Sequence, residues 1–214
     1  MRYRYSFLLI LLTVCTAAAR AQKPFTEGTI SYKVKLESTD HKIFNGTYTF
    51  TFKGGQIRKD LKLDNGYTNT ELLNIPANEV YSLQSMNGKN YAIQLNISDI
   101  VKAQQRYTGY NLTNEQGNEH IAGCAAYKAS LSYKGEAPSD VYYTKEWRPS
   151  QSLTFERFPD AGFLPLNYAY KEDNGMVMRF EAEKISAGPV ESSVFRIPAD
   201  HKLISNEEYK KMSR

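Results

Sequence analysis

The sequence predicts a mainly β protein: a single curved antiparallel sheet that forms an unclosed half-barrel, with one or two short helices. Three observations support this prediction. Apolar and polar residues alternate with a period of two along much of the chain, tight-turn pairs separate the alternating runs, and segments with a helical pattern are scarce. Because short strands joined by tight turns leave no room for long crossovers, the strands are expected to be antiparallel.

The alternation is regular enough to assign one buried and one solvated face to each strand. The runs lie at 30–36, 48–52, 57–63, 91–95, 127–133, 166–170 and 176–182. A meander of about nine or ten strands cannot stay flat, since strand twist curls a large sheet into a barrel or half-barrel. The apolar face is therefore expected to line the concave side.

Tight turns are expected where a pair of residues that contains glycine interrupts the alternation. Asn-Gly is the preferred pair for a two-residue type I′ turn, because both central residues take positive φ. The Asn-Gly pairs lie at 45–46, 65–66, 87–88 and 174–175, with similar pairs at 54–55 and 134–135. Each is interpreted as a hairpin connection.

Two segments favour helix and one favours a long loop. Residues 98–106 begin with a serine that can cap a helix and contain few β-forming residues. Residues 205–208 read Ser-Asn-Glu-Glu, a capping box that would open a final helix ending at Met212. Residues 148–162 carry two prolines with Ser, Asp and Gly around Leu153 and Phe155, and are interpreted as a loop or flap.

The first residues have the pattern of a cleavable secretory signal. Basic residues precede an apolar run at 7–14, and Ala19-Arg20-Ala21 fits the small-x-small cleavage rule. The run is shorter than the about 20 apolar residues that span a bilayer. We expect a signal peptide at 1–21 and one antiparallel β domain at 22–214, working in the periplasm or outside the cell.

A second processing route stays open, because Leu12-Thr13-Val14-Cys15 resembles a lipoprotein box. The residue before a lipidated cysteine is normally small, so Val14 favours cleavage after Ala21 instead. Cys124 is then the only cysteine of residues 22–214 and has no partner for an intrachain disulfide. No charged residue adjoins it, so a buried small side chain is expected rather than a reactive thiol.

Composition argues against a nucleic-acid partner. The full chain has 27 basic and 23 acidic residues, and removal of 1–21 takes away three arginines and no acid. The remainder has 24 basic against 23 acidic residues, a net charge near +1. No clustered basic footprint is visible in the sequence, and nucleic-acid-binding domains normally show one.

The sequence carries no motif for catalysis, for a cofactor or for a metal. Gly-x-Ser-x-Gly, Walker and dinucleotide-binding patterns are absent. The histidines lie far apart, at His41, His120 and His201. The carboxylates that could form a pair are interpreted as solvated charges; they are Glu71, Glu79, Glu146 and Glu156. A non-enzymatic protein without cofactor or metal is therefore expected.

Five segments match short motifs of one protein group in the expected order. They are Glu27-Gly28-Thr29-Ile30-Ser31-Tyr32, Ile121-Ala122-Gly123-Cys124 with Tyr127, Val141-Tyr142-Tyr143-Thr144-Lys145-Glu146, Gly162-Phe163-Leu164-Pro165-Leu166 and Phe195-Arg196-Ile197-Pro198-Ala199-Asp200. The chain thereby resembles uncharacterised secreted proteins of Gram-negative bacteria whose fold is similar to that of the lipoprotein carrier LolA. The resemblance implies an unclosed barrel with short helices at its mouth, and carriers of that fold hold acyl chains on the concave wall. The chain departs from the pattern of this group in two places: the cysteine is shifted toward Gly123, and a leucine precedes Pro165.

We therefore expect a non-enzymatic cell-envelope binding protein that shelters an apolar ligand, such as a lipid or a lipoprotein acyl chain, on the concave face. The expected wall residues are Tyr48, Phe50, Phe52, Ile57, Leu61, Leu63, Tyr91, Ile93, Leu95, Leu131, Met176, Met178 and Phe180. One alternative is a structural or partner-binding envelope protein with a self-filled core, whose interaction surface would be the exposed Lys, Thr and Tyr faces and the 148–162 loop. The other is a hydrolase of envelope lipids or glycans.

Overall fold

The computed structural model describes residues 22–150, 154–159 and 161–212. The predicted signal peptide, its cleavage point, Cys15 and Leu153 lie outside the described residues. The strands are β1 (Lys23–Phe25), β2 (Glu27–Glu37), β3 (Ile43–Lys53), β4 (Gln56–Leu63), β5 (Thr68–Asn74), β6 (Glu79–Met86), β7 (Lys89–Leu95), β8 (Asn111–Ile121), β9 (Cys124–Ser132), β10 (Ser139–Thr144), β11 (Trp147–Pro149), β12 (Leu164–Lys171), β13 (Val177–Ala187) and β14 (His201–Ser205). The helical elements are α1 (Ile97–Gln104), η1 (Gln105–Tyr107), η3 (Ser192–Phe195) and α2 (Asn206–Met212).

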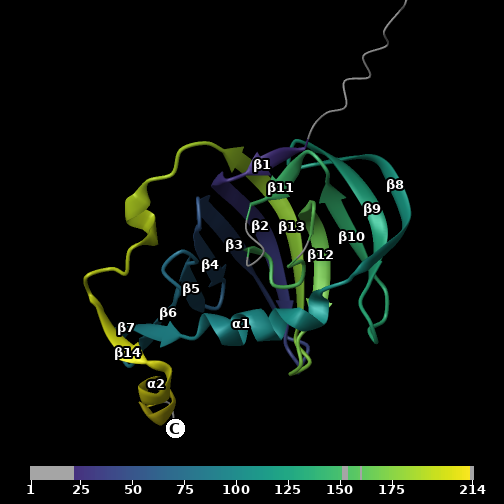
Figure 1. Ribbon diagram of the computed structural model, residues 1–214. Helices are drawn as coiled ribbons and strands as arrows, with labels where there is room; N and C mark the ends of the chain where they lie inside the picture. Colours follow the sequence, from purple (N-terminus) through teal and green to yellow (C-terminus); the bar gives the residue numbers. More distant parts are fainter. Residues whose placement is uncertain (1–21, 151–153, 160, 213–214) are drawn as a thin grey trace, which may run out of the picture.

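Twelve strands form one open sheet in the order β14-β7-β6-β5-β4-β3-β2-β13-β12-β10-β9-β8 (Figure 1). All its pairs are antiparallel except β14 with β7, and β1 and β11 form a separate parallel pair. The fold is therefore mainly β with one curved, unclosed sheet, as predicted. The sheet has more strands than the about nine or ten expected, because several strands carry only weak alternation.

Most predicted tight turns are confirmed, and one is wrong. Strands are joined at 54–55, 65–66, 87–88, 134–135 and 174–175. Residues 45–46 instead lie inside β3, where Gly46 pairs with Val34 of β2 and Leu63 of β4. A Cβ atom on Gly46 would lie 2.0 Å from the carbonyl oxygen of Lys62. Glycine is therefore required there by the close approach of two strands, not by a turn.

Both predicted helices form. The first begins at Ile97, directly after its cap Asn96, which lies two residues before the predicted cap Ser98. Asn96 Oδ1 accepts a hydrogen bond from the backbone N–H of Ser98 at 3.0 Å. The capping box before α2 is confirmed, since the Glu208 N–H donates to Ser205 Oγ at 3.2 Å and the Ser205 N–H donates to Glu208 Oε2 at 2.7 Å. Neither these helices nor any other described helix is long and apolar enough to cross a membrane.

The main core lies on the concave side of the sheet. Its buried side chains come from β2, β3 and β4 on one side and from β9, β10, β12 and β13 on the other. The sheet curls around this cluster, and α1 with η1 crosses its open side from the end of β7 toward β12 (Figure 1). A broad apolar face is thus turned inward, and one side of the sheet is left to be closed by irregular chain.

On the convex side the chain between β13 and β14 forms a strap, residues 188–200, that reaches the far edge of the sheet (Figure 1). Ile197 packs against the small outer cluster of Leu72, Leu83 and Ala92. Arg58 Nη1 donates a hydrogen bond to the carbonyl of Val194 at 2.8 Å. The strap therefore positions β14 beside β7 without touching the concave face.

Candidate binding site

The structure brings most of the predicted wall residues together on the concave face. In the main cluster, the buried ones are Phe50, Phe52, Ile57, Leu63, Leu131, Met178 and Phe180, and the partly buried ones are Tyr48, Leu61, Leu95 and Met176. Tyr91 and Ile93 lie apart from them, in a smaller cluster with Ile204 of β14. The ladder pairs Lys59 with Glu71, Glu71 with Ser82 and Ser82 with Ile93, so this smaller cluster lies on the same face, farther toward the edge.

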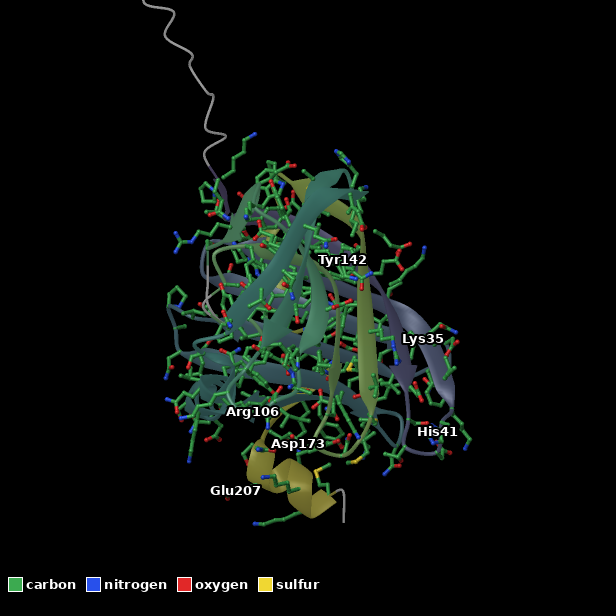
Figure 2. All side chains as sticks on the ribbon, turned by 90° about the vertical axis from the view of Figure 1, so that its right-hand side faces the viewer. Lys35, His41, Arg106, Tyr142, Asp173 and Glu207 are labelled. Carbon is green, nitrogen blue, oxygen red and sulfur yellow. The ribbon has the colours of Figure 1, made fainter. Side chains whose placement is uncertain are left out.

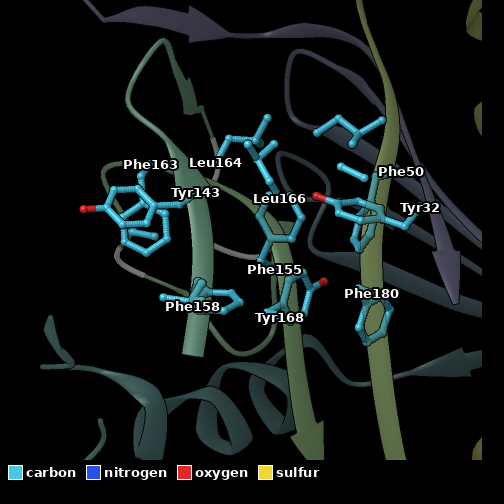
Figure 3. Close-up of a cluster of buried hydrophobic side chains, with 14 of the residues drawn as sticks. Tyr32, Phe50, Tyr143, Phe155, Phe158, Phe163, Leu164, Leu166, Tyr168 and Phe180 are labelled. Carbon is cyan, nitrogen blue, oxygen red and sulfur yellow. The ribbon is translucent and has the colours of Figure 1, made fainter. Parts of the chain in front are cut away.

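One irregular segment covers these walls. We call residues 154–159 and 161–163 the plug segment. Its Phe155 ring lies 4.9 Å from the ring of Phe50 and 6.5 Å from that of Tyr32, and Phe158 lies 5.1 Å from Tyr168, all between ring centroids (Figure 3). The described residues between β11 and β12 thus form a loop, as predicted, but the predicted range 148–162 begins inside β11, which includes Arg148 and Pro149. The aromatic side chains of the loop point inward rather than toward a partner.

Very little space remains beneath the plug segment. The cavity between it and the walls, bordered by Phe50, Phe155 and Phe180, has a volume of about 20 Å³. That is room for about one water molecule. The centre of the concave face is therefore filled by the chain's own side chains, as the self-filled alternative expects.

A larger cavity opens beside η1 and the ends of β9 and β12. This mouth cavity has a volume of about 480 Å³, within the range of about 300–1,000 Å³ that is usual for small-molecule sites. Its apolar and aromatic lining includes Tyr107, Leu131, Tyr133, Phe158, Tyr168 and Tyr170. At its rim Arg106 pairs with Asp173 at 3.1 Å (Figure 2).

Arg157 holds the plug segment at the mouth cavity. Its guanidinium lies 4.4 Å from the ring centroid of Tyr107 and 4.1 Å from that of Tyr170, a cation–π arrangement. Arg157 Nη1 also donates to Tyr107 Oη, and Nη2 lies 3.4 Å from Glu172 Oε2. The Arg157 carbonyl accepts a hydrogen bond from Tyr133 Oη. Burial lowers the pKa of Arg157, and Glu172 opposes that effect.

Lys59 is a buried cation in the middle of the apolar wall. It lies on the inward side of β4 and is 1% exposed. Its Nζ is 3.1 Å from Glu156 Oε1 in the plug segment and 3.6 Å from Glu71 Oε2 in β5. Burial acts to lower the pKa of Lys59, but the two carboxylates outweigh it, and the pKa lies above its ordinary value. Lys59 therefore stays charged and anchors the plug segment.

The two carboxylates at Lys59 differ in their surroundings. Glu71 is 23% exposed, and burial raises its pKa although Lys59 acts in the opposite direction. Glu156 is 47% exposed. The interpretation of Glu71 as a solvated charge is therefore wrong, while Glu156 faces water on one side and Lys59 on the other.

Cys124 is the one free cysteine among the described residues. Cys124 is buried as expected, and burial raises the pKa of its thiol. Within the part of the chain that the structure describes, no three His, Cys, Asp or Glu side chains form a group suited to a metal ion. Chemically, the concave face consists of an apolar wall with two buried cations, Lys59 and Arg157.

Comparisons with known proteins give structural likeness without sequence likeness. No protein-family model matches the chain, and no curated protein matches it. Among solved structures, MucB has 12% identity and a TM-score of 0.41, over 85% of this chain and 61% of that chain. MucB in complex with MucA(peri) has 11% identity and a TM-score of 0.43, over 83% of this chain and 57% of that one.

A third solved structure is the LolA superfamily protein NE2245 from Nitrosomonas europaea. It has 12% identity and a TM-score of 0.36, over 83% of this chain and 93% of that chain. The present chain thus spans less than two thirds of the length of the MucB chains, 61% and 57%, that it resembles. What it binds has to be inferred from its own residues.

Proposed function

We propose that the protein is a non-enzymatic binding protein of the bacterial cell envelope, working in the periplasm or outside the cell, and that it holds an acyl chain or a similar apolar ligand on its concave face. One observation carries the proposal: the apolar face of the open sheet is covered at its centre by one irregular segment, not by a second sheet. A sheet face of this kind needs a cover. A ligand chain that takes the place of the plug segment would meet the predicted walls.

The backbone–backbone hydrogen bonds described for the plug segment are internal to it. They run from Phe158 N–H to the Phe155 carbonyl at 3.1 Å and from Ala161 N–H to the Phe158 carbonyl at 3.2 Å. Side chains join its backbone to the rest of the fold, since the Arg157 and Gly162 carbonyls accept hydrogen bonds from Tyr133 and Gln22. Thr154 Oγ1 is buried and has no partner among the described residues. A buried unpaired hydroxyl costs about 1–3 kcal/mol. Displacement of the segment would relieve this penalty.

The mouth cavity would let a ligand chain enter the concave face. Arg157, Phe158, Tyr168 and Tyr170 line both the mouth cavity and the small cavity beneath the plug segment. Arg157 and Phe158 belong to the plug segment, so displacement of the segment would join the two spaces. The ligand chain would then run from the mouth toward Phe50 and Phe180, with Tyr91 and Ile93 beyond it.

Enlarging this route should strengthen the binding of a neutral apolar probe. Phe158→Ala is expected to bind N-phenyl-1-naphthylamine more tightly than the wild type, because the mouth cavity then extends along the walls. Phe25→Ala is the matched control: Phe25 is also a buried phenylalanine but packs against Phe52 and Trp147, with 5.5 Å between ring centroids in each pair, and lines neither cavity. Both changes should cost about 3–5 kcal/mol of stability. Equal probe binding by the two variants would contradict the proposed route.

A second candidate function follows from the filled interior. The volume of about 20 Å³ beneath the plug segment suits a partner-binding envelope protein whose core needs no ligand. Under this alternative neither Phe158→Ala nor the wild type would take up an acyl chain, and the protein would be recovered with another envelope protein through its polar outer surface.

A further inference from the structure

In the plug segment an aromatic side chain and a carboxylate lie next to each other on the apolar wall. They are arranged as the apolar tail and the charged head of an anionic amphiphile would be. Phe155 lies against Phe50 and Tyr32, and the next residue, Glu156, meets Lys59 Nζ at 3.1 Å. We propose that Lys59 recognises the head group of the ligand, and that the ligand is a long-chain carboxylate whose head replaces the Glu156 carboxylate at Lys59. This inference rests on the proposed function and names its ligand class.

Stability alone gives no reason for a lysine at this position. Lys59 occupies an inward position of β4, and its ladder neighbour on β3 is Phe50. A buried ion pair is often no more stabilising than apolar residues of similar volume. A charged group in the middle of an apolar wall is, in contrast, what orients a ligand in an apolar site, since a few placed polar groups provide its specificity.

The charge balance favours a single negative charge on the ligand. Lys59 and Glu71 balance each other, and Glu156 adds one negative charge. A ligand carboxylate would replace Glu156 charge for charge. Glu156, already 47% exposed, would return to water at little desolvation cost. A cationic head would leave Lys59 without its second partner.

The space at Lys59 favours a small head group as well. The cavity there, bordered by Tyr48, Lys59 and Glu156, has a volume of about 20 Å³. A planar carboxylate would fill the place of the Glu156 carboxylate, whereas a phosphodiester would need room for two ester arms. The tail would take the places of the Phe155 and Phe158 side chains and leave through the mouth cavity.

The test compares two ligands that differ only in the head group. Palmitate and 1-hexadecanol compete with N-phenyl-1-naphthylamine for the full chain. We expect the wild type to bind palmitate about tenfold more tightly than 1-hexadecanol, the difference that one charge-assisted hydrogen bond supplies. Lys59→Met should lose this preference and still bind 1-hexadecanol. Lys62→Met, which removes an exposed lysine from the opposite face of β4, should keep it.

A second variant covers the case in which Lys59→Met does not fold. Glu156→Gln removes the internal competitor and weakens the anchor of the plug segment, so it should bind palmitate more tightly. Because both ligands displace the plug segment, the affinity for 1-hexadecanol should rise as well, and the preference for palmitate should remain. Unchanged palmitate affinity in this variant would overturn the role of Lys59. Equal binding of the two ligands by the wild type would also overturn that role but leave the proposed function standing. Binding of neither ligand would instead contradict the proposed function itself.

Discussion

At the scale of single residues, Tyr32 ties the plug segment to the sheet. Its ring lies edge-on to those of Phe50, Phe155 and Phe180, at centroid distances of 5.6, 6.5 and 6.2 Å. Its hydroxyl donates a hydrogen bond to the carbonyl of Pro165 at 2.8 Å, and burial raises the pKa of Tyr32 well above its ordinary value. One side chain thus joins β2, the plug segment and β12.

Two substitutions separate the ring of Tyr32 from its hydroxyl. Tyr32→Phe should lower the free energy of unfolding by about 1–3 kcal/mol, because the buried Pro165 carbonyl loses its donor. Tyr32→Ala should lower it by about 3–5 kcal/mol, because a core cavity remains. Urea unfolding measures both, with Tyr67→Phe as a control at a tyrosine that is 50% exposed. Equal losses in the two Tyr32 variants would show that the ring adds nothing.

The position of Lys59 was predictable from the sequence, but its role was not. It stands between Ile57 and Leu61 at an inward position of an alternating strand, so a lysine facing the core could have been inferred from the spacing. Its partner Glu156 lies 97 residues away in the sequence, within a loop that has no periodicity. An ion pair between such distant segments becomes visible only in the fold.

At the scale of elements, the strap is attached by one network at its start. The Glu27 carboxylate accepts a hydrogen bond from the Val190 N–H at 2.9 Å and pairs with Lys53 Nζ at 3.3 Å. Lys53 Nζ also donates to the Val190 carbonyl at 2.6 Å. The bond from Val190, followed by the one from Lys53, holds the pKa of Glu27 below its ordinary value of 4.5.

The lowered pKa of Glu27 determines how its contribution to stability changes with pH. Because the pKa of Glu27 is lower in the folded than in the unfolded chain, its ionised form stabilises the fold above 4.5, and that contribution is lost as the pH falls through the folded pKa. Glu27→Gln should therefore be less stable than the wild type at pH 7, with the difference shrinking below pH 4.5. Urea midpoints across this range test it. A difference independent of pH would mean that the charge of Glu27 has no part in the attachment.

Other elements show where sequence patterns lose their meaning. Asn45 and Gly46 have the sequence of a hairpin turn but lie within β3. Glycine is needed at position 46 because the carbonyl of Lys62 on the neighbouring strand leaves no room for a side chain. The loop at 148–162 was predictable from its prolines and small residues. The inward direction of Phe155 and Phe158 was not, since an irregular segment gives no period from which a face could be read.

At the scale of the whole molecule, the alternation was sufficient to predict the open sheet and its apolar concave face. It did not predict that the chain covers this face itself. Sheet and cover come from different physical sources: the sheet follows from local periodicity, whereas the cover depends on Phe155, Glu156 and Arg157 meeting partners on β3, β4 and η1. The proposed function requires a ligand to displace the plug segment from this face.

The decisive experiment is native mass spectrometry of residues 22–214, purified from a bacterial periplasm and followed by organic extraction. If the concave face holds an acyl chain, the spectrum should show one discrete added mass that extracts as an acyl-containing molecule. A charge introduced into the wall by Phe50→Glu should abolish this mass in protein that remains folded by circular dichroism. A bare mass under every gentle condition would contradict the proposed ligand binding and leave the partner-binding alternative. Full lipid occupancy in folded Phe50→Glu would contradict the placement of the ligand on this wall.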